Sequence, residues 1–210
     1  MEYDAASQWY NASITIAAGW LATGGSVDYS AMVQPPDDIR AQLRRLGLDL
    51  ENLERGGQLI FTDWYTPALG QKSKERDSHS LRVADLSIYL GQTHIRGEPE
   101  PDKLMIGDDE STFARFNDEK PWMELELTRF IPGYKMKRIT SLIPVMNCVH
   151  SEWVYKRFEG ASDAVIDFKV DDSNDEVKNL MRIRLMRNVG FDSRWHRLKI
   201  GDNFEVALEK

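Results

Sequence analysis

Residues 139–170 read ITSLIPVMNCVHSEWVYKRFEGASDAVIDFKV, and this stretch predicts a strand, a polar turn, a helix and a second strand. Thr140 to Met146 is a short apolar run rich in β-formers, which is typical of a strand buried on both faces of a sheet. Ser151 can cap the helix and Gly160 can end it, and Ala164 to Val170 predicts the next strand. This order of elements indicates an α/β protein.

Polar residues follow the first of these strands, at Asn147 and His150. Ligands of α/β sheets bind outside the carboxyl ends of the strands, so we expect a polar site at this point. Cys148 lies between the two residues, but a cysteine–histidine nucleophile also needs a carboxylate that orients the imidazole. No carboxylate is obvious for that role, which leaves a packed cysteine as the alternative.

Strands and helices alternate along the rest of the chain, and Gly, Pro and Asp mark most of the joins. This alternation predicts one α/β domain over residues 1–210, with a mainly parallel sheet covered by helices on both faces. The expected helices are Asp4–Leu21, one from Pro36 to Gly47, one capped by Ser78 with Leu81, Ala84 and Ile88 on one face, and Pro121–Ile131. The expected strands are Val27–Val33, Gln58–Asp63, Lys103–Gly107, Leu180–Arg187, Leu198–Ile200 and Phe204–Leu208.

Composition limits the classes of function. The chain has 27 basic and 34 acidic residues, a net charge of −7, and no basic tail, so nucleic-acid binding is not indicated. A single cysteine excludes an internal disulfide and suits a reducing compartment. The most apolar early segment, Ala12 to Ala22, is too short to span a bilayer. We therefore expect a cytoplasmic protein with no membrane partner and no structural metal.

Asp108 and Asp109 follow the apolar strand Leu104–Gly107, so this strand delivers two carboxylates at its carboxyl end. A magnesium–phosphate site uses carboxylates in that position. The other interpretation is a strand that ends in a solvated acidic turn, because aspartates are common in turns. The sequence alone leaves both interpretations open.

A phosphate-binding loop of the form GxxxxGK[ST] is absent from the chain. Such a loop needs glycines that let backbone N–H groups converge on phosphate, and a lysine that supplies a point charge. The nearest match, Gly70-Gln71-Lys72-Ser73, has the wrong spacing and does not directly follow a predicted strand. The sequence therefore offers no independent phosphate site.

The order of elements after Ile139 resembles the closing part of archaeal-type KaiC-like ATPase domains of the RecA superfamily. The resemblance implies a RecA-like sheet with a C-terminal antiparallel β-hairpin extension. The resemblance rests on the Asp163-Ala164-Val165-Ile166 strand start and on the terminal strands from Leu180, and it extends over most of residues 20–208. It implies that Asp108, Asp109 and Ser111 lie in a nucleotide–magnesium site, with ATP and Mg²⁺ as cofactors. It also implies that the phosphate loop would directly precede the first helix, near Met1 to Gln8, and that the loop and its central strand are missing.

The same resemblance indicates a compromised catalytic step. It places Val33 and Gln34 where the family has paired glutamates, and neither residue can act as a general base. Arg187 is similar to the arginine of a family "K-x-R" segment that reaches the γ-phosphate of a neighbouring subunit, while Leu185 stands at the lysine position. The alternative is that the arginines of this strand pair with nearby acidic residues, namely Asp171, Asp172 or Asp175.

From this resemblance we expect a degenerate KaiC-like protein, a pseudo-ATPase that acts as a regulatory or assembly subunit. An alternative is an ATP-binding subunit whose loop lies upstream of this start or comes from a partner. A third hypothesis, a recombinase-related DNA-binding protein, is disfavoured by the acidic charge. The missing strand predicts an empty position in the sheet, which would be covered by a second copy or a related KaiC- or RecA-like subunit.

Overall fold

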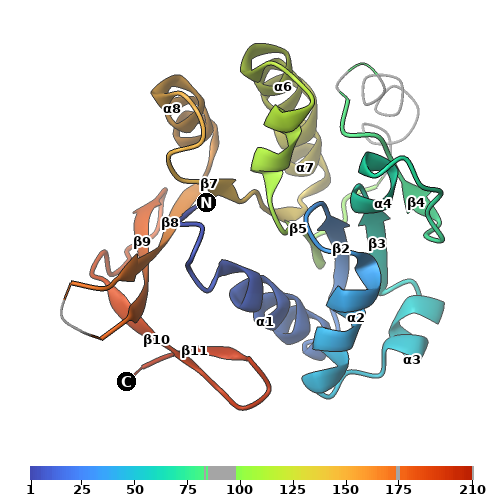
Figure 1. Ribbon diagram of the computed structural model, residues 1–210, viewed down its shortest axis with the longest axis horizontal. Coiled ribbons are helices and arrows are strands. Elements are labelled where there is room, and N and C mark those ends of the chain that lie inside the picture. Colours follow the sequence, from blue (N-terminus) through green and yellow to red (C-terminus); the bar gives the residue numbers. More distant parts are fainter. Residues whose placement is uncertain (83, 85–97, 174–175, 210) are drawn as a thin grey trace.

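The computed structural model describes residues 1–210 except 83, 85–97, 174–175 and 210. Figure 1 shows a twisted central sheet with helices on both faces. The strands are β1 (Glu2–Tyr3), β2 (Ser26–Ala31), β3 (Leu59–Asp63), β4 (Asp77–Ser78), β5 (Lys103–Gly107), β6 (Thr140–Leu142), β7 (Val145–Met146), β8 (Ala164–Asp171), β9 (Lys178–Met186), β10 (His196–Ile200) and β11 (Val206–Leu208). The helices are α1 (Trp9–Ala22), α2 (Pro36–Arg45), α3 (Leu50–Arg55), α4 (Tyr65–Ala68), η1 (Glu110–Arg115), α6 (Glu119–Leu125), η2 (Glu126–Phe130), α7 (Ile131–Lys137) and α8 (Glu152–Ala161).

The strands form two sheets that continue into each other. One has the order β4-β3-β2-β5-β6 and the other β11-β10-β9-β8-β1-β7. Only residues 143–144 separate β6 from β7, and Pro144 lacks the N–H that an unbroken strand would use. In the five-stranded sheet all pairs are parallel, and β1 pairs in parallel with both β7 and β8. The remaining pairs, β8 with β9, β9 with β10 and β10 with β11, are antiparallel. The predicted fold class is therefore confirmed.

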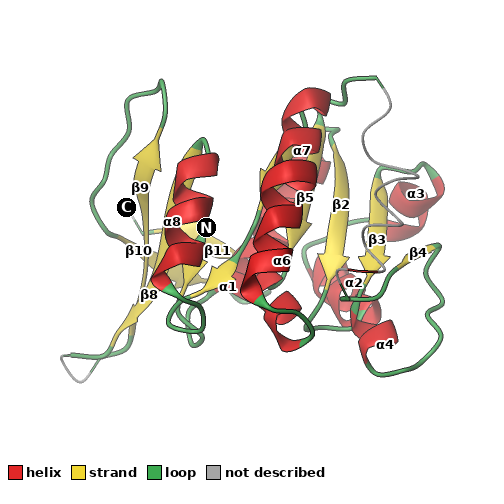
Figure 2. Cartoon of the chain, turned by 90° about the horizontal axis from the view of Figure 1, so that it is seen from above, coloured by secondary structure: helices red, strands yellow, loops and turns green. Residues whose placement is uncertain are grey.

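Two cores lie on opposite faces of the sheet. One joins the sheet to α1, α2 and α3, and its largest buried side chains are Trp9, Tyr3 and Tyr29. The other contains α6, α7 and α8, with Trp122 at its centre. Figure 2 shows α6, α7 and α8 together in front of the strands. Helices consequently cover both faces of the sheet, as is usual for parallel α/β sheets.

The helix that begins at Glu119 continues to Lys137 as α6, η2 and α7. The predicted end of this helix at Ile131, directly before Pro132, is wrong. Proline removes one backbone donor and its ring clashes with the carbonyl four residues earlier. Here the Ile131 N–H bonds to the Glu126 carbonyl five residues back, and this π-helical shift lets the chain pass Pro132 without ending the helix.

Other boundaries differ in smaller ways. The first helix begins at Trp9 rather than Asp4, because residues 2–3 pair in the sheet. Ser78 belongs to β4 and does not cap a helix, while most of the helix predicted after it, including Ile88, lies outside the described residues. The short helix α3, capped by Asp49, was not predicted. Within the described ranges, every helix is too short or too polar to cross a membrane.

Candidate functional site

The short strand β1 lies between β8 and β7 in the six-stranded sheet. Glu2 and Tyr3 pair in parallel with β7 on one side and with β8 on the other. The Met1 carbonyl accepts from Val145 N, the Tyr3 carbonyl accepts from Asn147 N, and Asp4 N donates to the Phe168 carbonyl. The prediction of an empty slot is wrong, because Met1 to Tyr3 satisfy the backbone groups of both neighbouring strands at this point.

The connection from β1 to α1 consists of residues 4–8, Asp-Ala-Ala-Ser-Gln. It lies where the resemblance puts the phosphate loop, directly before the first helix. It contains no glycine and no lysine, and Ser7 N already donates to the Asp4 carbonyl at 2.8 Å. This connection therefore lacks the residues that a phosphate-binding loop requires.

Trp9, the first residue of α1, closes the space beside this connection. Its side chain is fully buried, and Nε1 donates to the Asp108 carbonyl at 2.8 Å. Its ring also packs against Tyr3 and, edge to face, against Phe168. An indole thus joins the first turn of α1 to the carboxyl end of β5.

Asp108 is buried at the end of β5, and both carboxylate oxygens are used within the chain. Oδ1 accepts from Met32 N at 2.8 Å, and Oδ2 accepts from Val33 N at 3.1 Å and Gln34 N at 3.0 Å. Burial raises the pKa of Asp108 to about 7, while these three backbone donors oppose the rise. The carboxylate holds the turn after β2, which carries Val33 and Gln34, the two residues that the resemblance places at the family's glutamate positions.

Asp109 and Ser111 are also engaged. Asp109 Oδ1 accepts from Ser111 N at 2.9 Å and Oδ2 from the Thr112 hydroxyl at 3.3 Å, so Asp109 caps η1. Ser111 Oγ accepts from Met146 N at 2.8 Å and links η1 to β7. Asp108, Asp109 and Ser111 lie together at the carboxyl end of β5, and each has a structural partner there.

Asn147 and His150 point to different parts of the molecule. Asn147 Nδ2 donates to Asp4 Oδ1 at 2.8 Å, so Asn147 joins the connection between β1 and α1. The His150 side chain is 1% exposed, its ring is tilted by 44° against that of Trp122, and its Nδ1 lies 3.4 Å from Glu119 Oε1. Burial lowers the pKa of His150, and the Glu119 carboxylate opposes this. The two residues do not form one site.

Cys148 is exposed beside them and has a left-handed backbone, with φ 64°. It is therefore not the packed cysteine that the alternative interpretation expected. Among the described residues, no hydrogen bond joins the Cys148 thiol to the buried imidazole of His150. A cysteine–histidine pair has no support in this arrangement.

Arg187 directly follows β9, and its side chain reaches the C-terminal end of α8. Its Nε donates to the Ser162 carbonyl at 3.0 Å, and Nη2 reaches the Glu159 carbonyl at 3.4 Å. Cations at helix C-termini satisfy the last carbonyls and interact favourably with the helix dipole. The role of Arg187 toward a neighbouring subunit stays a prediction.

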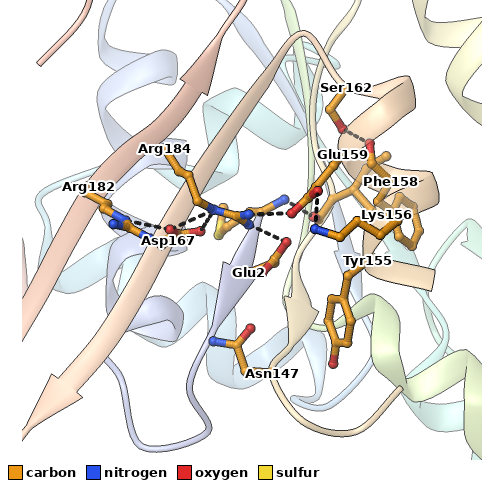
Figure 3. Close-up of polar contacts among 12 residues, drawn as sticks. Glu2, Asn147, Tyr155, Lys156, Phe158, Glu159, Ser162, Asp167, Arg182 and Arg184 are labelled. Carbon is orange, nitrogen blue, oxygen red and sulfur yellow. Dashed lines mark hydrogen bonds and ion pairs between the residues drawn. The ribbon is translucent and has the colours of Figure 1, made fainter. Parts of the chain in front are cut away.

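Arg184, within β9, makes the ionic contacts that the sequence did not reveal. Figure 3 shows its guanidinium among carboxylates from three elements: Glu2 of β1 at 2.5 Å, Asp167 of β8 at 3.0 Å, and Glu159 of α8. Arg182 also pairs with Asp167, at 2.8 Å. The expected partners Asp171 and Asp172 are not used by these arginines, and Asp175 lies outside the described residues. Arg184 therefore ties the short central strand β1 to its neighbours.

We expect Arg184→Met to lower the free energy of unfolding by about 2 kcal/mol, because three carboxylates lose a shared, partly buried cation. Urea unfolding measures the change. Arg194→Met is the control, since Arg194 contacts only exposed Asp192 among its described ionic partners, and no change is expected for it. Equal stabilities of the two variants would contradict the anchoring of β1 by Arg184.

The comparisons with known proteins agree with this architecture. Parallel strands covered on both faces, with an antiparallel extension, define an α/β domain of the RecA type. A family model described as "ATPase: KaiC" matches residues 16–208, so the chain belongs to the KaiC family. It is similar to the crystal structure of a KaiC-like protein from the hyperthermophilic archaeon Pyrococcus horikoshii OT3, with a TM-score of 0.71 and 16% identity over 100% of this chain and 88% of that chain. No curated protein matches the chain.

Proposed function

We propose that this KaiC-family chain does not hydrolyse ATP by itself and serves as a regulatory or assembly subunit for a related ATPase. The observation that carries the proposal is the connection between β1 and α1, which has no glycine or lysine and lies beside the buried indole of Trp9. The family resemblance and the single cysteine favour the cytoplasm as its location.

ATP and Mg²⁺ do not fit the residues present. Both oxygens of Asp108 accept from backbone N–H groups, and Asp109 caps η1. Among the described residues there is also no group of three His, Cys, Asp or Glu side chains able to hold a metal ion. Gln34 Oε1 accepts from Gln42, and Val33 is apolar, so neither residue is available as a base.

The free energy lost with the phosphate loop is large enough to make nucleotide binding weak. Each charge-assisted hydrogen bond from a phosphate loop contributes about 1.5–3 kcal/mol. Losing four of them weakens binding by about four orders of magnitude or more. An acidic domain without this loop is better suited to contacts with another protein than to holding a nucleotide.

We expect the purified chain to bind Mg-ATP with a dissociation constant no tighter than the millimolar range and to release no phosphate above background. Titration calorimetry and a phosphate-release assay measure both. The double variant Val33→Glu/Gln34→Glu, which restores the carboxylates but not the loop, should stay inactive. A low-micromolar dissociation constant with phosphate release by the wild-type chain would contradict the proposal.

The partner arm of the experiment uses a KaiC-like ATPase from the same cell. The wild-type chain should change the turnover or assembly of that ATPase at stoichiometric concentration. Arg187→Ala tests the predicted contact in trans. If this variant no longer changes the turnover or assembly of the ATPase, a role of Arg187 at the partner's nucleotide is supported. If the variant acts like the wild-type chain, the regulation runs through other surfaces. A chain that leaves turnover and assembly unaltered is not a subunit of that ATPase.

A further inference from the structure

A cavity of about 320 Å³ lies where β6, the first residues of β8 and the amino-terminal end of β1 meet. Met1 lines it beside β1, and Ile143 lines it directly after β6. The helix α7 contributes Ile131, Tyr134 and Lys135 to the same lining. The cavity is therefore bounded by strands on two sides and by a helix on one face.

The pairing of β1 explains why this cavity is open. Glu2 pairs with Val145 of β7 on one side and with Asp167 of β8 on the other. Met1 continues this pattern by one residue, since its N donates to the Ile143 carbonyl and its carbonyl accepts from Val145 N, both at 2.9 Å. Beyond Met1, no described residue pairs with β6 or with the start of β8 on this side.

Two strand edges thus face the cavity without a strand between them. Among the described strands, β6 pairs only with β5, and residues 164–166 of β8 pair only with β9. A free edge presents backbone N–H and C=O groups that can pair with another chain. At Met1 the two sides are two strand spacings apart, about 9–10 Å. One extended backbone therefore fits between them.

The lining of the cavity is nearly uncharged. Among the described residues, its only charged side chains are those of Lys135 and Asp163, which pair with each other at 3.0 Å. Leu142 and Ile166 are half-buried, whereas Leu104 of the neighbouring strand β5 is 1% exposed. Apolar side chains beside the sheet edges thus stay partly open to water, and an apolar occupant would cover them.

We propose that this cavity, the β6–β8 groove, is a docking site for an extended, uncharged segment of another protein, which pairs as a strand with β6 and β8. The backbone of the segment supplies the missing N–H and C=O partners, and its alternate side chains meet the apolar lining. A peptide matches the strand repeat of about 3.3 Å on both edges. A charged segment would lose its hydration against this lining. The docking does not depend on the proposed effect on an ATPase, and each can fail without the other.

The test uses two synthetic octapeptides of alternating valine and threonine, one starting with each residue, with blocked ends and an added pair of lysines for solubility. Amide hydrogen exchange of the whole 210-residue chain is followed by NMR. One of the peptides should slow the exchange of amides within residues 140–143 and 164–166. Exchange within β11, another free edge, should stay the same. No protection of the groove by either peptide, or equal protection of β11, would overturn the proposal.

Two controls isolate strand pairing from general adhesion. Methylation of every second peptide nitrogen removes backbone donors but keeps the side chains, so the loss of three hydrogen bonds should weaken binding at least about tenfold. Ala164→Phe places a ring in the groove and should weaken binding to a similar degree. Ala207→Phe, on exposed β11, should leave binding unchanged. Equal affinities of the methylated and unmethylated peptides would overturn the pairing. If Ala164→Phe does not fold, the methylated peptide decides alone.

A second copy of this chain is the other occupant that the experiment recognises. Without peptide, we expect the exchange of residues 140–143 and 164–166 to be independent of protein concentration. Protection of these residues that increases with concentration would assign the β6–β8 groove to self-association, and it would overturn a segment of a different protein as the occupant.

Discussion

Asp108→Ala is expected to lower the free energy of unfolding by about 3–5 kcal/mol. The substitution leaves the N–H groups of Met32, Val33 and Gln34 without the carboxylate that accepts from all three. A buried donor without a partner costs about 1–3 kcal/mol, and water that enters the vacated space recovers part of the sum. Urea unfolding at pH 8, where the carboxylate is largely ionised, measures the change.

Two variants make this result specific. Asp108→Asn keeps one carbonyl oxygen in place, so it should lose less stability than Asp108→Ala. Asp102→Ala, at the opposite end of β5 and exposed, should change the free energy of unfolding by less than about 0.5 kcal/mol. If Asp108→Ala were as stable as the wild-type chain, the carboxylate would not be a structural clamp, and a ligand role would return as the better explanation.

The sequence predicted the elements whose patterns are local. The bounds of β5 were predicted residue for residue, because an apolar run between Asp102 and Asp108 leaves little choice. The helix after Ser151 and the strand after Asp163 were also predicted to within about one residue. Ser151 stands at the N-cap position, but its hydroxyl donates to Glu119 and makes no capping hydrogen bond. These elements decide the α/β class.

The central strand β1 could not be predicted in this way. Two residues carry no periodicity, and Glu2 and Tyr3 become a strand only because β7 and β8, more than 140 positions away, offer them partners. The partners of Arg184 depend on the same pairing, since Glu2 lies opposite Asp167 in the sheet. Once β1 was missed, the sequence suggested only nearby acidic partners, namely Asp171, Asp172 and Asp175.

The candidate site shows the same limit. An aspartate after a buried strand looks alike whether it serves a metal ion or a turn, because the backbone donors of Met32, Val33 and Gln34 leave no mark in the sequence. The absence of the glycine-rich loop could be predicted, because the loop is defined by residue types that the sequence shows directly. The position of Trp9 beside Asp108 could not be predicted, because an apolar residue in the first turn of a helix indicates burial but does not indicate which residues it contacts.

Trp9→Ala is expected to lower the free energy of unfolding by about 3–5 kcal/mol, the usual range for truncating a buried aromatic residue. The Asp108 carbonyl loses its indole donor at the same time. Trp9→Phe keeps most of the ring volume and should cost about 1–2 kcal/mol, which isolates the hydrogen bond. Trp153→Ala, at an exposed tryptophan, is the matched control and should be close to wild type.

The same variant separates two reasons for weak nucleotide binding. If the indole of Trp9 merely blocked a competent site, Trp9→Ala would bind Mg-ATP far more tightly than the wild-type chain. We expect no such gain, because residues 4–8 supply neither a lysine nor glycines, and removal of a side chain adds no donor for phosphate. Calorimetry on the folded variant measures this, with Trp9→Phe as a second folded form. Low-micromolar binding by Trp9→Ala would show that blockage, and not the missing donors, keeps the nucleotide out.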